Sequence, residues 1–222
     1  MDYERKVFYQ DRAVAETYFE NRFTSPKAVR QHQGLKEALQ EALASISGIR
    51  KLLDLPCGTG RFTDFFYEKG FEYIGVDISK EMLDVLAQGQ ISLNRTPALL
   101  RSDGEALALK DNSVDCIVCI RLFQLIPRAA KQAVLKEMLR VSAKWLILEV
   151  MYVHSLHHFR RTKSLLRRLF GGRRPIYDLD KDILNTGWQE YARVRVKHTK
   201  HWVGVYKKLS SLNDDFNRIR HS

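Results

Sequence analysis

The feature that most constrains the fold is an alternation of short apolar runs and helical segments, which begins after about residue 25. Apolar runs at 51–55, 73–76, 98–101, 114–120 and 145–150 predict five strands. Segments with helical spacing at 34–45, 61–69, 80–87 and 129–139 lie before or between them. Repeated units of this kind predict an α/β fold, in which a parallel sheet carries helices on its faces.

The pattern changes after residue 150. A basic segment at 155–170 has helical spacing, 171–175 is typical of a linker, and 180–185 predicts another short helix. The segments 191–196 and 202–207 alternate like the two arms of a terminal antiparallel pair.

Composition excludes several classes of protein. Hydrophobic residues make up 45% of the 222 residues, which is too many for a disordered chain. No apolar run approaches the roughly 20 residues that span a bilayer, and the first six residues are too polar for a secretory signal. We therefore expect a cytoplasmic protein.

The positive charge is concentrated in the last third of the chain. Residues 1–150 hold 21 Lys and Arg against 20 Asp and Glu, whereas residues 151–222 hold 16 against 6. Such asymmetry favours an anionic partner surface, without indicating which one.

The three cysteines do not form a disulfide framework, because they are few and odd in number. Cys116 and Cys119 have C-x-x-C spacing, but they lie inside the predicted strand 114–120 and no second Cys or His pair accompanies them at finger spacing. We expect both to be small core residues. With no clustered carboxylates or HExxH motif in the chain, we expect no metal site.

The strongest motif lies where the first strand ends, in the segment 52–62 (LLDLPCGTGRF). A strand that enters a tight glycine loop lets a ligand approach the backbone, and the following helix start adds free N–H donors. No Lys-Ser/Thr pair follows the loop, which excludes a phosphate-binding P-loop, and the spacing is not that of the dinucleotide motif.

Two further acidic positions follow later strands. Asp77 ends the second strand, 23 residues after Asp54, where a carboxylate can accept hydrogen bonds from both hydroxyls of a ribose. Asp103 follows the third strand, where it can accept from an adenine amino group while a neighbouring N–H faces the ring.

With these motifs in order, the chain from about Ala13 to Lys208 resembles the class I S-adenosylmethionine-dependent methyltransferases, in the branch that includes the ubiquinone and menaquinone biosynthesis type. The resemblance implies a doubly wound, Rossmann-like, seven-stranded, mostly parallel sheet with a terminal antiparallel strand and helices on both faces. It also implies S-adenosylmethionine as cofactor, with S-adenosylhomocysteine as product. The expected regions are N-terminal cap helices (1–48), a donor-binding core (49–154), a basic amphipathic insertion (155–175), a C-terminal helix and β-hairpin (176–209) and a polar tail (210–222).

The resemblance also implies roles for single residues. The residues at the loop, Asp54, Cys57, Gly58 and Gly60, would line the methionine half of the donor. Those after the second and third strands, Asp77, Ile78, Asp103 and Gly104, would hold the ribose and adenine. Arg121 and Leu122 after the fourth strand would close the pocket, and the N-terminal Tyr18 and Arg22 would cap it.

Two positions depart from the family pattern. Pro56 stands where the loop usually has its first glycine, and Gln124-Leu125 stands where many relatives have a His-His pair. Because glutamine cannot act as a general base, a base must come from elsewhere if one is needed. His154, just beyond the fifth strand, is our first candidate; Tyr152, His157 and His158 are weaker ones.

Three functions stay open. The leading hypothesis is methyl transfer to a small-molecule or lipid-linked acceptor, such as a quinone precursor or envelope glycolipid, with 155–175 resting on the anionic inner face of a membrane. An equal reading of 155–175 is a solvated helix docked on the sheet. RNA methylation through the basic last third, and a non-catalytic S-adenosylmethionine-binding scaffold, are the alternatives.

Overall fold

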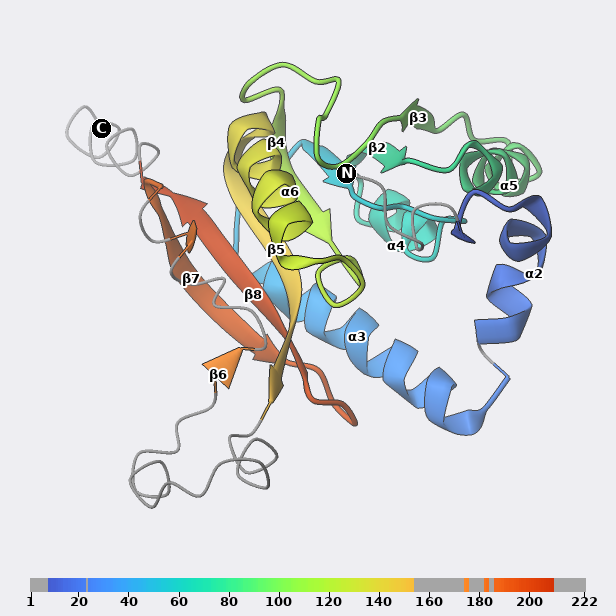
Figure 1. Cartoon of the computed structure of the whole chain (residues 1–222), viewed down its shortest axis with the longest axis horizontal. Helices are drawn as coiled ribbons and strands as arrows, with labels where there is room; N and C mark the ends of the chain where they lie inside the picture. Colours follow the sequence, from blue (N-terminus) through green and yellow to red (C-terminus); the bar gives the residue numbers. More distant parts are fainter. Residues whose placement is uncertain (1–7, 23, 154–173, 176–181, 184–185, 210–222) are drawn as a thin grey trace.

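The computed structural model describes residues 8–22, 24–153, 174–175, 182–183 and 186–209. Its sheet runs in the order β3-β2-β1-β4-β5-β8-β7, and a two-residue strand, β6, pairs with the end of β5 (Figure 1). The strands are β1 (Lys51–Asp54), β2 (Glu72–Asp77), β3 (Ala98–Arg101), β4 (Val114–Cys119), β5 (Ser142–Val153), β6 (Arg174–Pro175), β7 (Trp188–Arg195) and β8 (His201–Lys208).

The first five strands pair in parallel, and β8 pairs antiparallel with both β5 and β7. This confirms the predicted seven-stranded, mostly parallel sheet with its antiparallel hairpin. The β5 strand extends beyond the predicted 145–150, because it pairs with β4 on one side and with β8 on the other. The β6 strand falls in the segment expected to be a linker.

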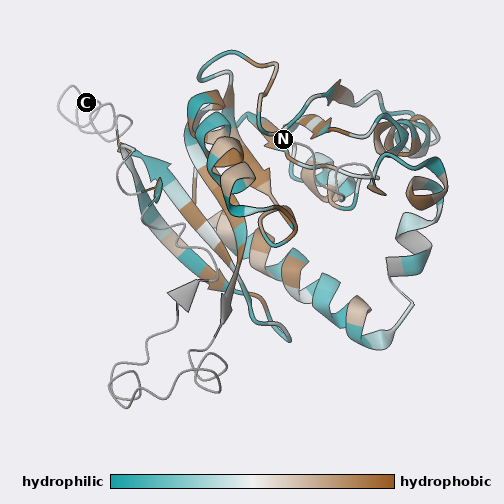
Figure 2. Ribbon diagram, in the orientation of Figure 1, coloured by the Kyte–Doolittle hydropathy of each residue, from teal (hydrophilic) through white to brown (hydrophobic). Residues whose placement is uncertain are grey.

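Five helices are α2 (Arg12–Arg22), α3 (Pro26–Ala44), α4 (Thr63–Glu68), α5 (Lys80–Ile91) and α6 (Arg128–Val141). Two buried clusters cover the two faces of the sheet: one joins it to α3, α4 and α5, and the other joins it to α6. Figure 2 shows α3 and α6 each with apolar residues toward the sheet and polar residues on the outer side. The fold is therefore the doubly wound one that the sequence predicts.

Helix α3 begins eight residues earlier than the apolar spacing from Gly34 indicates. Ser25 caps it by accepting a hydrogen bond from Ala28 N at 3.2 Å, and Pro26 occupies the first turn, where its missing N–H is not needed. Gly34 instead serves packing inside the helix. A Cβ there would lie 2.7 Å from the carbonyl oxygen of Lys197, so its absence lets the β7–β8 turn approach α3.

Cys116 and Cys119 are both fully buried and carry free thiols. Being three residues apart on β4, they point to opposite faces of the sheet and belong to different core clusters. Burial raises the pKa of both thiols, so both stay protonated near neutral pH. The prediction that they are core residues is confirmed.

No helix in the described ranges is long and apolar enough to cross a membrane.

Candidate functional site

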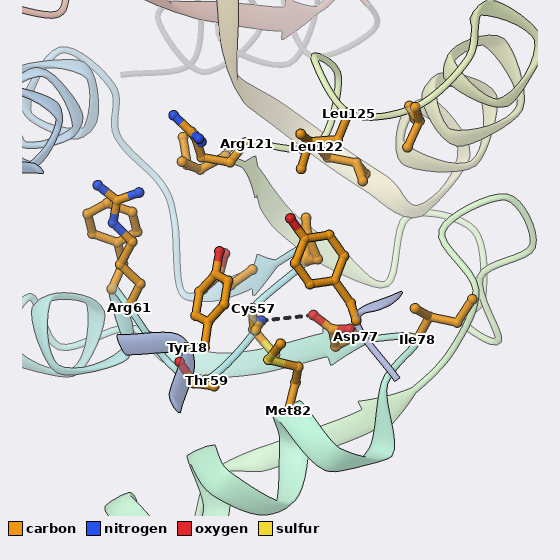
Figure 3. Close-up of a pocket in the computed structure, with 17 residues that line it drawn as sticks. Tyr18, Cys57, Thr59, Arg61, Asp77, Ile78, Met82, Arg121, Leu122 and Leu125 are labelled. Atoms are coloured by element: carbon orange, nitrogen blue, oxygen red, sulfur yellow. Dashed lines mark hydrogen bonds between the residues drawn. The ribbon is translucent and has the colours of Figure 1, made fainter. Parts of the chain in front are cut away.

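A pocket opens at the carboxyl ends of β1, β2 and β4, the edge where ligands bind in sheets of this kind (Figure 3). We call it the carboxylate pocket, because two buried acids lie in its wall. Its lining residues are Tyr9, Tyr18, Asp54, Pro56, Cys57, Gly58, Thr59, Arg61, Phe62, Asp77, Ile78, Met82, Ile120, Arg121, Leu122, Leu125 and Ile126.

Asp77 joins the glycine loop to the end of β2. Its Oδ2 accepts a hydrogen bond from Gly58 N at 2.9 Å, and its Oδ1 accepts one from Ser79 N at 2.9 Å. Burial raises the pKa of this carboxyl, and the backbone N–H groups of Ser79, Gly58 and Ile78 oppose the rise. A carboxylate has about four lone-pair sites, so Asp77 keeps capacity for the hydroxyls of a ligand.

Asp54 lies at the end of β1 and is 3% exposed. Burial, and then the nearby Asp77, raise its pKa to about 8, against a weak hydrogen bond from the Tyr73 hydroxyl at 3.5 Å. A buried acid pair of this kind favours a ligand that brings positive charge.

The two loop glycines have different tasks. Gly58 has φ of 55°, a conformation open to glycine, and a Cβ there would meet no atom within 4 Å. Gly60 has φ of 89°, and a Cβ would lie 2.9 Å from Leu86 Cγ. Gly58 therefore exposes its backbone to the pocket, whereas Gly60 packs the loop against α5.

Two polar atoms of the pocket wall have no hydrogen-bond partner among the described atoms. They are Thr59 Oγ1 and Arg121 Nε, both buried. Arg121 also has φ of 66°, which is uncommon for a residue other than glycine and concentrates at functional sites. Since buried polar groups are normally satisfied, these atoms indicate that the wall is built for a polar ligand.

The structure brings together most of the residues predicted for the donor. Eight of them line the carboxylate pocket: Tyr18, Asp54, Cys57, Gly58, Asp77, Ile78, Arg121 and Leu122. Gly60 lies just behind its wall. Sequence reasoning missed Tyr9, Thr59, Met82 and Leu125. Tyr9 packs edge-on against Tyr18 at 6.1 Å between ring centroids, a contact that no local spacing announces.

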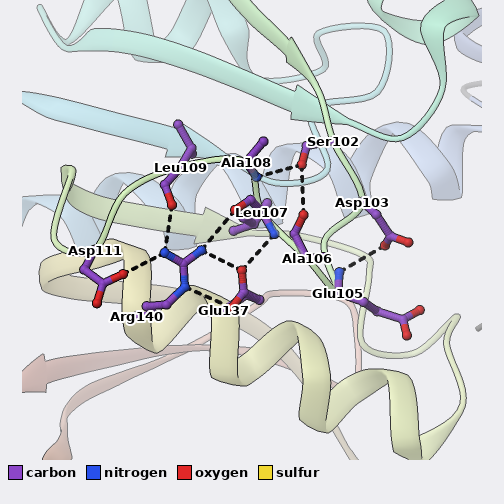
Figure 4. A network of polar contacts seen from close by, with 10 residues as sticks. All are labelled: Ser102, Asp103, Glu105, Ala106, Leu107, Ala108, Leu109, Asp111, Glu137 and Arg140. Atoms are coloured by element: carbon purple, nitrogen blue, oxygen red, sulfur yellow. Dashed lines mark hydrogen bonds and ion pairs between the residues drawn. The ribbon is translucent and has the colours of Figure 1, made fainter.

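Asp103 and Gly104 do not line this pocket. Asp103 accepts a hydrogen bond from Glu105 N at 3.0 Å, within a loop held to α6 by Arg140 (Figure 4). Arg140 donates to the carbonyl oxygens of Leu107 and Leu109, at 3.0 Å and 2.7 Å. Arg22 ends α2, but its side chain lies outside what the structure describes, as does His154 entirely.

A second pocket of about 750 Å³ adjoins the first and shares Arg61 and Arg121 with it. It lies between the first turns of α3, the end of β5 and the β7–β8 turn, and we call it the basic pocket. Its lining residues are Lys27, Ala28, Gln31, Leu35, Arg61, Arg121, Glu149, Met151, Arg195, Val196, His198, Thr199, Lys200 and His201.

Glu149 of β5 connects the walls of the two pockets. Its Oε2 accepts hydrogen bonds from Arg121 N at 2.9 Å and from Gln124 Nε2 at 3.4 Å, and its Oε1 lies 2.7 Å from His201 Nδ1. Burial acts to raise the pKa of Glu149, but the hydrogen bond and charge of His201 lower it overall. Glu149 therefore stays ionised and holds the His201 ring. The sequence analysis named neither residue.

Comparison with known proteins identifies the central part of the chain. Residues 52–144 match the methyltransferase domain family. This segment therefore resembles methyltransferase domains. It contains the glycine loop, Asp77 and the end of β4, and so most of the wall of the carboxylate pocket.

Individual relatives agree with that assignment. An uncharacterised methyltransferase of Mycobacterium tuberculosis is 39% identical over 80 residues, which cover 36% of this chain and 31% of the relative. The 18S rRNA (guanine-N(7))-methyltransferase RID2 of Arabidopsis thaliana is 30% identical over 131 residues, covering 58% and 42%. The chain spans less than half the length of these curated relatives.

Solved structures show the same fold. The magnesium protoporphyrin IX methyltransferase of Synechocystis PCC 6803, crystallised with bound S-adenosylmethionine, has a TM-score of 0.66 and 16% sequence identity. The match covers 93% of this chain and 98% of that one. The Rossmann-like fold of that structure therefore extends over nearly the whole chain.

Proposed function

We propose that the protein is an S-adenosylmethionine-dependent methyltransferase that acts on a small-molecule or lipid-linked acceptor. The observation that carries the proposal is the pair of adjoining pockets. One presents two buried carboxylates at the family's glycine loop, and the other opens from it past Arg61 and Arg121.

The chemistry of the carboxylate pocket suits S-adenosylmethionine. Asp77 would accept from the ribose hydroxyls, Gly58 would offer its backbone to the methionine part, and Ile78, Met82 and Leu122 give apolar walls for the adenine. Thr59 Oγ1 and Arg121 Nε would gain the partners they lack. Roles for Arg22, Gly60, Asp103 and Gly104 toward the donor also belong to this proposal, with Asp103 reaching the adenine only from a different loop position.

When bound, S-adenosylmethionine supplies an electrophilic methyl carbon to a nucleophile aligned with its carbon–sulfur bond. The protein contributes mainly by holding the acceptor in line, which can lower the barrier by about 7–11 kcal/mol. His201 would serve as the base. In the neutral tautomer whose Nδ1–H donates to Glu149, its Nε2 would have a lone pair to take the proton from an acceptor hydroxyl or amine. His154, the first candidate from the sequence, lies outside the described residues and stays a prediction.

RNA methylation is the second candidate, favoured by the likeness to an rRNA methyltransferase over 58% of the chain and by the positive charge of the last third. The branch of ubiquinone and menaquinone biosynthesis, and contact of 155–175 with the inner face of a membrane, remain predictions. Residues 155–173 of that segment lie outside the described ranges.

The test is methyl transfer from radiolabelled S-adenosylmethionine to a fractionated cell extract, with lipid, RNA, protein and small-molecule pools counted separately. The proposal expects label in the lipid or small-molecule pool, and no label with Asp77→Ala. Label confined to RNA would establish the second candidate instead. Donor binding without transfer to any pool would favour the non-catalytic scaffold.

A further inference from the structure

We infer that the basic pocket recognises its acceptor through an anionic group, a carboxylate or a phosphate, placed between the start of α3 and the β7–β8 turn. The inference rests on the proposed function and names the chemical class of its acceptor. The basic pocket adjoins the carboxylate pocket, and the two share the side chains of Arg61 and Arg121.

The lining of the basic pocket is predominantly positive. Five lining residues carry a permanent positive charge, and Glu149 is the single acid. That acid is already engaged by His201 and by the backbone N–H of Arg121. The five cations are Lys27, Arg61, Arg121, Arg195 and Lys200. The pocket therefore offers an anion a surface on which five cations face a single acid.

The cations of the β7–β8 hairpin differ in whether they form ion pairs. Arg193 forms an ion pair with Glu190, and Lys197 forms one with Glu37 at 2.8 Å. By comparison, Arg195 and Lys200, which line the pocket, form no ion pair with any described residue, and neither does Lys27 across from them. Lys27, Arg195 and Lys200 are therefore available to a ligand as far as the described residues are concerned.

The basic pocket lies beside a helix start and opens toward the carboxylate pocket. The first turns of α3 supply Lys27, Ala28 and Gln31 to the wall, and a helix start favours negative charge. Arg61 and Arg121 stand at the junction of the two pockets, where the reacting group must meet the donor. An anion at the far end would leave the nucleophile beside His201 and the methyl group.

The volume of about 750 Å³ lies in the range of small-molecule sites. It suits an acceptor of moderate size whose anionic group is held at one end. An extended RNA strand would instead use the whole outer face of the hairpin, including Arg193 and Lys197.

The experiment measures binding of two probes, sodium benzoate and inorganic pyrophosphate, to the purified full chain saturated with S-adenosylhomocysteine. The test variant is Arg195→Gln with Lys200→Gln, both exposed positions. The matched control is Arg193→Gln with Lys197→Gln, which also removes two positive charges from the hairpin, but at positions that do not line the basic pocket. Calorimetry of S-adenosylhomocysteine in every sample checks the donor site separately.

At least one probe should bind the wild type, and the test variant should weaken it by about 10- to 100-fold, as expected for the loss of charge-assisted hydrogen bonds. The control should change binding by less than about twofold. Preference for benzoate or for pyrophosphate then distinguishes a carboxylate from a phosphate acceptor.

Equal weakening in both variants would overturn the inference, because it would show a general effect of charge. Absence of binding of both probes to a chain that binds S-adenosylhomocysteine would overturn it as well. Tight binding of a short RNA that both variants lose would assign the hairpin to nucleic acid. Failure to bind S-adenosylhomocysteine would instead count against the proposed function.

Discussion

The two adjoining pockets differ in the balance of their charges although they share Arg61 and Arg121. The carboxylate pocket has Asp54 and Asp77 in a largely apolar wall, whereas the basic pocket sets five cations against Glu149. On the proposed function, the buried acids would lie beside the positively charged sulfonium donor, and the cations of the basic pocket would meet the anionic group of the acceptor. The difference in charge would then help to keep the binding places of the two substrates apart.

The buried acids of the two regions differ in the same way. Asp54 is crowded by another acid and has a raised pKa, whereas Glu149 is paired with His201 and has a lowered pKa. One is suited to respond to a cationic ligand, and the other to hold a base in place.

The largest effect should come from the base. His201→Gln is expected to lower kcat by about 100-fold or more, since general base catalysis contributes about 10²–10⁴. Donor affinity should stay unchanged, because His201 lies outside the carboxylate pocket. Steady-state kinetics over a pH series measures both. An unchanged kcat and pH profile would remove the base from the basic pocket.

The next effect is on the donor side. Asp77→Ala should weaken S-adenosylhomocysteine binding by about 100-fold, because it removes a carboxylate that can accept two ribose hydroxyls and also anchors Gly58 N and Ser79 N. Calorimetry measures the loss. Glu149→Gln is the matched control on the acceptor side, and equal losses in the two variants would erase the distinction between the pockets.

Asp54 should make the stability of the protein depend on pH. Its folded pKa of about 8 lies above the unfolded value of 3.8, so the folded chain holds the proton longer. The contribution of Asp54 to the free energy of unfolding therefore falls as pH rises from 4 toward 8, by at most about 1.4 kcal/mol per pH unit. In urea unfolding, the stability of Asp54→Asn relative to the wild type should rise as the pH rises over this range. A difference that is constant with pH would contradict the raised pKa.

The smallest effect should be confined to the basic pocket. Gly34→Ala places a Cβ 2.7 Å from Lys197 O and must push the β7–β8 turn away from α3, at a cost of about 1–3 kcal/mol. Pyrophosphate or benzoate binding should weaken while S-adenosylhomocysteine binding persists. Ala38→Gly, elsewhere on the same helix, is a control for stability alone. Equal loss of both ligands in Gly34→Ala would mean that the two pockets are not independent.

Local sequence predicted the donor side of the site because its parts are short and contiguous. A strand, a glycine loop and a helix lie within 52–62, and the acid that ends the next strand follows 23 residues after Asp54. The seven-stranded sheet was predictable for the same reason. The core positions of Cys116 and Cys119 were also predictable, because side chains three residues apart on a strand point to opposite faces of the sheet.

The acceptor side was not predictable, because its residues meet only through the sheet. His201 and Glu149 are 52 positions apart, and their contact depends on β8 pairing antiparallel with β5, with Met151 opposite His201. Lys27 lines the same pocket as Arg195 and Lys200 because Gly34 lets the β7–β8 hairpin approach α3. No periodicity along the chain contains that information.

The most direct test of the central claim is equilibrium dialysis of radiolabelled S-adenosylmethionine against the purified chain. The account predicts saturable binding of one donor per chain, displaced by S-adenosylhomocysteine and greatly weakened in Asp77→Ala. Absence of saturable binding, or binding that Asp77→Ala leaves intact, would contradict the assignment of the carboxylate pocket to the methyl donor.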